Sequence, residues 1–585
     1  MSLNAKILLG VGLVAAALFL AGLGTAPFVD PPEGFHAVIA RDMLRLGDWV
    51  TPHIDGVRYF DKPPLMYWIM ASAFALLGAG EGPARLGAAL PAVGVAVVTA
   101  WIGLRLGGPR VGLVAGLMVA ANLELYLFAR LVKPDLLFVF CIFLAFAGFI
   151  AAYLRHREER AGPARWALLL FYAGLGASVL AKDLLGALAP PLVLGLFFLI
   201  TGERAIVRRW VPWAGVLLFL AIALPWYLVV ELRNPGFLWY TVVDNHILNV
   251  TRQRVFPDED VPLGTVEFLV VTAAGFLPWS LVLPAALWRR FRRPSQTPED
   301  RMWLLLSLWA VGAVAAVALS PFKLPHYGLP AFPALALIVA KHWDEMLEGK
   351  PGAPSALGVL SPPLVLLGAA ALTTVLVWQG VIPLLQGVLT SVDVTTRNME
   401  ARGGQLPFLA AGEAMPLFRS AALALGLGAV GAALALALRR PVIGLGAILA
   451  GMLAFLPISA EGFALFARSR SVRPLGQGVA LRAGPADILV HEGPLENSGA
   501  WLMDLERPVK VVNGRVSNLA FGATFPEAHD IFWDTERLAA AWRGEARVYL
   551  LTGLHPEASV MHRLPPDTVH LIQQGGGRWL YSNRP

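Results

Sequence analysis

The stretch RDMLRLGDWVTPHIDGVRYFDKPPLMYWIMASAFALLG, residues 41–78, lies between two long apolar runs near the start of the chain. These runs, near 7–26 and 83–104, each reach the length of about 20 residues that a membrane-crossing helix needs. The stretch itself belongs to a polar loop that spans residues 27–82. Its apolar end, 66–79, is too short to cross a membrane and predicts an interfacial or re-entrant helix.

The composition of the whole chain indicates a multi-pass α-helical membrane protein. Of its 585 residues, 57% are hydrophobic and only 15% are charged, whereas soluble domains carry about 25% charged residues. The first apolar run resembles a signal peptide, but the many later runs favour a retained anchor. Cys141 is the single cysteine, so the chain has no disulfide framework.

The apolar runs predict thirteen crossings, near 7–26, 83–104, 111–128, 135–154, 166–181, 185–201, 211–231, 264–288, 302–320, 328–341, 357–379, 417–438 and 442–460. Four basic clusters separate some of them: 155–165, 203–209, 289–301 and 439–441. With a cytoplasmic N-terminus, all four clusters fall on the cytoplasmic side, as the positive-inside rule requires. This placement accounts for most of the net charge of +7, and no zinc-ligand spacing, Walker loop or nucleic-acid-binding pattern appears.

Ionisable residues gather in the loops on the opposite, external side. The turn that holds Lys182 is so short that this lysine must lie near membrane depth, where a charge is costly unless it is paired or faces a wet cavity. A single lysine there could simply extend to the lipid headgroups, but five external loops carry acids or bases near helix ends. Several cations suit a lipid phosphate. The acids suit proton transfer, a metal, or a sugar amine or hydroxyl.

Several motifs in these loops resemble those of a known family. The stretch GDWVTPHIDGVRYFDKPPLMYW (47–68) closely resembles the first external loop of the lipid A aminoarabinose transferases. AKDLLG (181–186), GFLPWSLVLPAAL (275–287) and LSPFKLPHYGLPAFPALAL (319–337) resemble further motifs of that family. The family belongs to the polyprenyl-phosphate-sugar transferases with the GT-C fold, which include protein O-mannosyltransferases.

The resemblance implies a reaction and its partners. A sugar, such as an aminopentose or hexose, would pass from a polyprenyl (undecaprenyl) phosphate to a lipid A-like, glycan or protein acceptor at the outer face of the bacterial inner membrane. No nucleotide cofactor is needed. The rival interpretations are a transporter or flippase of polyprenyl-linked sugars, which would show inverted repeats and broken helices, and a catalytically impaired relative that only binds the lipid.

The segment before the quoted stretch, VDPPEGFHAVIARDML (29–44), departs from the family. Glu33 aligns with the family glutamate, but Pro32 stands where relatives have an aspartate that is often treated as catalytic. From the residues alone, Asp30 is expected to cap an interfacial helix and Glu33 to complete a capping box. We expect Glu33 at the reaction centre and Asp30 as the second catalytic candidate, while His36 continues the face of Glu33.

The resemblance implies the other site residues. Lys62 would face the donor or leaving phosphate, and Asp135 is a further acid candidate. The other phosphate candidates are Arg58, Lys182 and Lys323, and the acceptor or loop candidates are His36, Lys133 and His326. Asp61 and His246 correspond to residues that hold a divalent metal ion in some relatives.

After residue 460 the apolar runs end. Four segments predict short strands: ADILVHEG (486–493), PVKVVNG (508–514), ARVYLLTG (546–553) and TVHLIQQGG (568–576). DTERLAAAWRG (534–544) predicts a helix that Asp534 or Thr535 caps and Gly544 ends. The chain therefore divides into a transmembrane module, 1–460, and a soluble, external α/β domain, 461–585.

Overall fold

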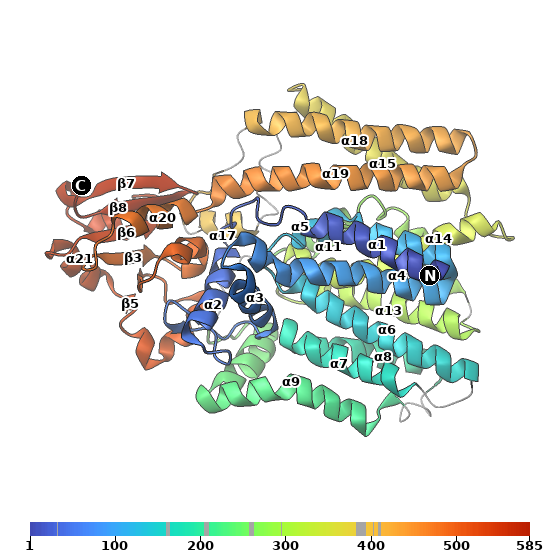
Figure 1. Cartoon of the computed structure of the whole chain (residues 1–585), viewed down its shortest axis with the longest axis horizontal. Coiled ribbons are helices and arrows are strands. Elements are labelled where there is room, and N and C mark those ends of the chain that lie inside the picture. Colours follow the sequence, from blue (N-terminus) through green and yellow to red (C-terminus); the bar gives the residue numbers. More distant parts are fainter. Residues whose placement is uncertain are drawn as a thin grey trace.

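The computed structural model describes residues 1–31, 33–159, 164–203, 210–256, 262–293, 295–381, 394–401, 403–407 and 411–585. Figure 1 shows a block of roughly parallel and antiparallel helices with a smaller sheet-containing unit packed against one end. Pro32 and most of the basic cluster 203–209 lie outside the described residues.

Helices occupy the positions expected for the crossings. They are α1 (Leu3–Leu20), α4 (Glu81–Ala120), α6 (Asp135–Glu159), α7 (Arg165–Ala181), α8 (Leu185–Thr201), α9 (Trp213–Arg233), α11 (Thr265–Gly275), α12 (Leu283–Arg292), α13 (Pro298–Leu319), α14 (Phe332–Glu348), α15 (Ala356–Trp378), α18 (Ala411–Ala437) and α19 (Pro441–Arg470). Within the described residues, 8 helices are long and apolar enough to span a membrane.

Two of the expected crossings differ from simple helices. The range of α4 contains a non-helical residue, Gly108, with φ of 82°. A Cβ on Gly103 would lie 2.8 Å from the Cα of Gly112, so the chain turns back on itself there and the two halves pack closely. The run 264–288 was expected to be one crossing, but turns separate α11 from α12 within it.

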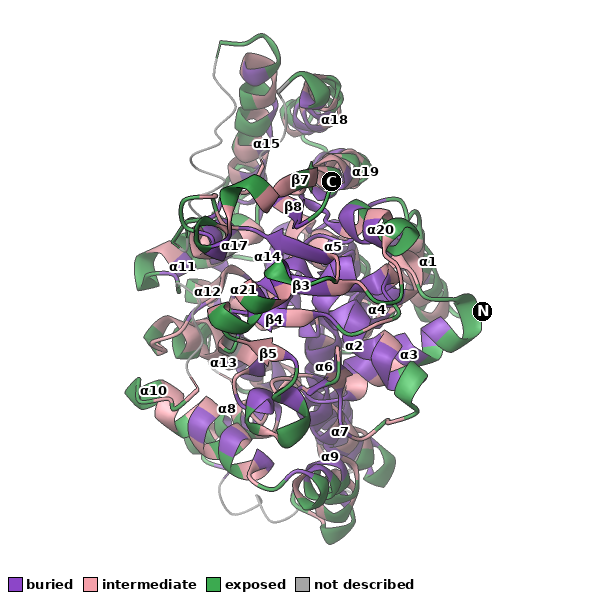
Figure 2. Cartoon of the chain, turned by 90° about the vertical axis from the view of Figure 1, so that its left-hand side faces the viewer, coloured by how far each residue is buried: buried purple, intermediate pink, exposed green. Residues whose placement is uncertain are grey.

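The first external loop forms α2 (Glu33–Leu46), the strands β1 (His53–Ile54) and β2 (Val57–Arg58), and α3 (Leu65–Leu77). α2 ends as predicted, because Gly47 takes a left-handed conformation with φ of 66°. Ten residues of α2 are buried within the protein, so most of this helix is covered by other parts of the chain (Figure 2). It packs between α3 and the 3-10 helix η4 (Leu495–Asp504).

The C-terminal unit carries a six-stranded sheet in the order β5-β4-β3-β6-β8-β7. Its strands are β3 (Ile488–Glu492), β4 (Lys510–Val512), β5 (Phe532–Trp533), β6 (Val548–Thr552), β7 (His570–Gly575) and β8 (Arg578–Ser582). The β5-β4-β3-β6 part is parallel, and β8 pairs antiparallel with β6 and β7. As predicted, Asp534 caps the helix α21 (Thr535–Arg543) by accepting from the amide of Arg537 at 2.7 Å.

The membrane block runs directly into this unit. α19 continues past residue 460 to Arg470, and after a two-residue break α20 (Arg473–Arg482) leads into β3. The C-terminal unit is therefore connected to the end of a long helix and lies beside the first loop (Figure 1).

The first loop and the C-terminal unit are joined by polar contacts and by close backbone packing. The guanidinium of Arg41 donates to the carbonyl oxygens of Leu502 and Met503, the latter at 2.9 Å. The Asp55 carboxylate accepts from the amide of Val509 at 3.1 Å. Gly34 touches the backbone of Ala500 so closely that a Cβ there would overlap it. The C-terminal unit thus fixes the shape of the loop that carries half of the expected site residues.

Candidate functional site

Most of the expected site residues meet at the end of the helical block that faces the C-terminal unit. We call this set the charged cluster; it comprises His36, Asp61, Lys62, Lys133, Asp135, Lys182 and His326. Each member interacts electrostatically with at least one other. They come from α2, from the loop before α3, from the turn before α6 and the first residue of α6, from the residue that ends α7, and from the 3-10 helix η3 (Pro325–Ala331).

Asp135 is the centre of one half of the cluster. The Nζ atom of Lys182 donates to its Oδ1 at 2.6 Å, and the Nε2 atom of His326 lies 3.6 Å from the same oxygen. The Lys182 ammonium also lies 4.4 Å from the ring centre of Tyr327, a cation–π contact. A charge near membrane depth, where Lys182 was expected, is costly unless it is paired or faces a wet cavity. Asp135 supplies the partner.

The two histidines of the cluster are neutral near pH 7. Burial, together with the positive charges of Lys133 and Lys62, lowers the pKa of His36 to about 3. Burial likewise lowers the pKa of His326 to about 3, against the opposing effect of Asp135. The Nδ1 atom of His36 is 2.8 Å from the hydroxyl of Tyr67. These histidines can therefore position hydroxyl or amine groups but carry no charge for a phosphate.

The other half of the cluster is the ion pair between Asp61 and Lys62. Burial acts to raise the pKa of Asp61, but the charges of Lys62 and Arg254 lower it below its ordinary value. Arg254 is itself held 3.2 Å from Asp244, whose other oxygen accepts from the amide of Val255 at 2.6 Å. The carboxylate of Asp61 is therefore ionised and stabilises the ammonium beside it.

The metal ion expected at Asp61 and His246 stays a prediction, and both side chains have protein partners. The Nδ1 atom of His246 lies 2.6 Å from the carbonyl oxygen of Thr241, within its own π-helical segment η2 (Trp239–Leu248). Asp61 is engaged with Lys62. Within the described ranges, no three His, Cys, Asp or Glu side chains lie together in a way that could hold a metal. No step below depends on a metal.

Glu33 has structural partners on both of its carboxylate oxygens. Oε1 accepts from the Nε of Arg85 at 2.9 Å and from the amide of Val132 at 3.0 Å. Oε2 accepts from Arg85 Nη2 at 2.7 Å and from the amide of Val29 at 3.0 Å. Because both side chains of the ion pair are fully buried, these contacts favour a bracing role for Glu33 in place of the expected role at the reaction centre.

Replacing Glu33 by Gln is expected to destabilise the protein, because the amide cannot accept all four bonds and leaves the buried Arg85 charge unpaired. Breaking a buried ion pair typically costs about 3–5 kcal/mol. Thermal unfolding in detergent, measured beside turnover, should show both falling together. The control is Glu461→Gln, which breaks an exposed pair with Arg468 that is worth little. Full stability with lost turnover in Glu33→Gln would return this residue to the reaction centre.

Asp30 does not act as the expected helix cap. Its carboxylate accepts from the amides of Ala500, at 2.8 Å, and Val472, at 3.4 Å, both in the C-terminal unit. Burial raises its pKa to about 7, although these amides and Arg578 act to lower it. Asp30 therefore anchors the start of α2 to the C-terminal unit, outside the charged cluster.

Two further phosphate candidates are engaged elsewhere. Arg58 donates to Asn234 Oδ1 at 2.7 Å, pairs with Glu527 and stacks 4.3 Å from the ring centre of Phe525. Lys323 is buried and donates to the carbonyl oxygen of Ser320 at 2.6 Å. Arg58 thus joins the first loop to the C-terminal unit, and Lys323 shapes the turn before η3.

Sequence reasoning left out three residues beside the cluster: Tyr67, Arg254 and Tyr327. Tyr327 could have been found, because the motif LSPFKLPHY ends on it. Tyr67 lies in the stretch that carries the family resemblance. It belongs to an apolar helix, where the sequence pattern does not distinguish a tyrosine at the site from one in the core. Arg254 lies in a loop whose path across the site only the fold reveals.

Comparisons with known proteins support the family resemblance seen in the sequence. Residues 30–241 match the family described as dolichyl-phosphate-mannose-protein mannosyltransferase. The chain is 32% identical over 371 residues to the undecaprenyl phosphate-alpha-4-amino-4-deoxy-L-arabinose arabinosyl transferase of Pseudomonas aeruginosa (strain LESB58), covering 62% of this chain and 64% of the relative. The protein of the same name from Edwardsiella ictaluri (strain 93-146) is 31% identical over 349 residues, covering 58% and 60%. The matches therefore span about three fifths of the length of these curated relatives.

Two solved structures match nearly the whole length of this chain. ArnT from Cupriavidus metallidurans bound to undecaprenyl phosphate superposes with a TM-score of 0.78 and 23% identity, covering 98% of this chain and 97% of that one. Its apo state gives a TM-score of 0.78 and 22% identity, covering 100% and 98%. At this identity the likeness establishes the fold. The resemblance seen in the sequence is confirmed: the chain is similar in sequence to these arabinosyl transferases and has the fold of ArnT.

Proposed function

We propose that the chain is a glycosyltransferase that moves a sugar from an undecaprenyl-phosphate-type donor to a lipid A-like, glycan or protein acceptor. The observation that carries this proposal is the charged cluster. With both histidines neutral, three lysines, Lys62, Lys133 and Lys182, outnumber two aspartates at a buried position. Such a site favours an anionic phosphate, and the names of the similar proteins supply the polyprenyl carrier and the aminoarabinose.

The cluster has the groups that this transfer needs. The bond between the sugar C1 and a phosphate oxygen breaks, and its electron pair remains on the leaving polyprenyl phosphate. Lysine ammonium groups stabilise the charge that develops there. An acceptor oxygen forms the new bond to C1. An acceptor that is already anionic needs no base, whereas a hydroxyl would pass its proton to a carboxylate, for which Asp135 is the best-placed candidate.

The same geometry supports placing the cluster at the outer face of the inner membrane. Asp135 is the first residue of α6, and at the far end of that helix Arg157 pairs with Glu203, which also pairs with Arg301. A helix of this length, 25 residues, extends about 37 Å. Arg157 and Arg301 belong to two of the basic clusters that the positive-inside rule assigns to the cytoplasm. The C-terminal unit, beside the first loop, would then be periplasmic.

The flippase interpretation is less well supported. Transporters of that kind bind their substrate near the middle of the membrane, between broken helices. The charged cluster instead lies at one end of α6 and α7.

Turnover by the purified protein in lipid tests the proposal. Undecaprenyl phosphate-linked aminoarabinose is supplied with lipid A, and mass spectrometry follows both lipids. The expected result is loss of the donor with a matching gain of one sugar by lipid A. If the donor is consumed only when a glycan or a protein replaces lipid A, the proposed transfer stands and only the identity of the acceptor changes. A folded protein that consumes no donor with any acceptor would overturn the proposal.

A further inference from the structure

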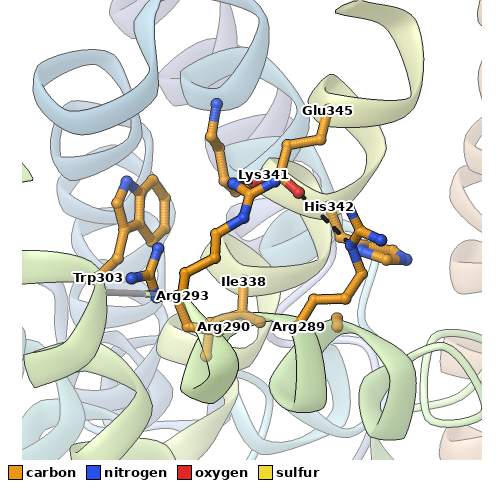
Figure 3. A pocket seen from close by; sticks show the side chains of 9 residues that line it. Arg289, Arg290, Arg293, Trp303, Ile338, Lys341, His342 and Glu345 are labelled. Carbon is orange, nitrogen blue, oxygen red and sulfur yellow. Dashed lines mark hydrogen bonds and ion pairs between the residues drawn. The ribbon is translucent and has the colours of Figure 1, made fainter. Parts of the chain in front are cut away.

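A basic cleft lies at the end of the helical block opposite the charged cluster (Figure 3). It is formed between α12, α13 and α14. Its charged and titratable lining residues are Arg289, Arg290, Arg293, Lys341, His342 and Glu345. Four permanent cations and one carboxylate thus line the cleft, and Lys341 also pairs with Asp344 beside it at 3.2 Å.

The local sequence explains why the arginines gather here. Three of the cleft's cations stand within the WRRFRR run, 288–293, at the C-terminal end of α12. The partial negative charge of a helix C-terminus stabilises cations at this position. Glu345 on α14 pairs with Arg293 and lies 3.9 Å from the Nε of Arg289. Arg290 Nη1 lies 3.5 Å from Asp300.

These pairs leave buried donors unused. Within the part of the chain that the structure describes, the Nε of Arg289 and both the Nε and Nη2 of Arg290 are buried without a hydrogen-bond acceptor. The side chain of Arg290 is only 9% exposed. Buried polar groups are nearly always hydrogen-bonded, and leaving one unpaired is costly. A ligand that carries several acceptor oxygens would satisfy these unused donors.

The outer side of α12 shows what surrounds the cleft. Trp288 is 60% exposed and Phe291 is 46% exposed, and the guanidinium of Arg292 stacks 4.0 Å from the ring centre of Trp288. Exposed aromatic and basic residues together at a helix end are typical of the boundary between lipid tails and headgroups. A ligand of this cleft therefore comes from the membrane side.

We propose that the basic cleft binds the phosphate of an anionic phospholipid in the cytoplasmic leaflet. Guanidinium groups form paired, charge-assisted hydrogen bonds with phosphate oxygens, and basic pockets between helices on the cytoplasmic side suit such headgroups. The positive-inside rule accounts for arginines in this loop. It does not account for their sharing a cleft with unused, buried donors. The site is separate from the charged cluster and does not depend on the proposed transfer.

Lipid binding by the purified full chain tests this site. The protein is stripped of lipid and reconstituted in phosphatidylcholine with or without phosphatidylglycerol, and retained lipid is measured by native mass spectrometry. The wild type is expected to retain phosphatidylglycerol and to unfold at a higher temperature with it. Arg290→Gln should weaken this retention about tenfold or more, which is the expected loss for a hydrogen bond between charged groups. Arg292→Gln removes the same charge from the same helix, outside the cleft, and should bind like the wild type.

Further arms separate the alternatives. Arg289→Gln, whose side chain is 29% exposed, gives a second readout if Arg290→Gln folds poorly, and it should also bind weakly. Arg290→Lys, which keeps the charge but loses the planar fork, should restore binding only in part. Equal retention by the wild type and both glutamine variants would overturn the proposal. Inorganic phosphate that displaces phosphatidylglycerol and stabilises the protein equally well would overturn the assignment to a lipid.

Discussion

Purified protein with Lys62→Ala is expected to lose turnover by about 10- to 150-fold while it remains folded and inserted. This range corresponds to the 1.5–3 kcal/mol that a hydrogen bond to a charged group contributes. The loss has two physical sources. The variant removes an ammonium from the charged cluster, and it takes from Asp61 its paired cation, so that this carboxylate repels an incoming phosphate more strongly. The measurement is consumption of the polyprenyl-phosphate sugar donor.

Two control variants separate those sources. Asp61→Asn with Lys62→Ala removes both charges and should recover part of the lost turnover if repulsion by Asp61 contributes. Lys350→Ala removes a lysine whose side chain is 75% exposed and should leave turnover unchanged. Wild-type turnover in Lys62→Ala would contradict the assignment of this lysine to the phosphate.

Replacing Gly34 by Ala is expected to separate the C-terminal unit from the first loop. A Cβ at this position overlaps the backbone nitrogen of Ala500, and a Cβ on Gly499 would likewise overlap the backbone of Phe35. Overpacking in a rigid core typically costs about 1–3 kcal/mol. Here no flexible side chain can move aside, so we expect a cost at or above the top of that range. Thermal unfolding should occur earlier, and proteases should cut the junction near residue 471 more readily.

Gly24→Ala is the matched control for that substitution. Its Cβ would lie 3.6 Å from the nitrogen of Gly82, which is an ordinary contact. Loss of turnover is expected only in Gly34→Ala, because α2 carries His36 of the charged cluster. If Gly34→Ala has wild-type stability and protease resistance, the backbone contact between α2 and η4 is not required for docking.

The sequence predicts the parts of the fold that rest on local pattern. Apolar runs locate the helices, and Gly47 and Gly544 mark the helix ends. Local pattern does not reveal contacts with segments far away in the chain. α2 has the amphipathic pattern of an interfacial helix, yet η4, more than 450 residues later, covers its other side. The strand β8, RWLYS, was not predicted, although its Trp and Tyr are typical of strands; it is short and directly follows three glycines, which indicate a turn.

The same distinction applies to the candidate site. The motifs identify Lys62, Asp135 and Lys182 as functional residues, but nothing in their spacing predicts that Lys182 pairs with Asp135. Glu33 is the clearest case. Its motif position indicates chemistry, and its partner Arg85 lies at the far side of the loop, at the start of another helix. Only the folded arrangement distinguishes a carboxylate that braces the loop from one that faces a substrate.

The anchoring of Asp30 by Ala500 and Val472 has a consequence for how the protein is made. Glu33 and Arg85 are 52 residues apart and can meet early, whereas the partner Val472 follows Asp30 by 442 residues. At a synthesis rate of about 5–20 residues per second, that interval lasts roughly 20–90 s. During this time the first loop has emerged from the ribosome without the surface that covers it. Assembly of the loop is therefore a late step, completed only when nearly the whole chain has been translated.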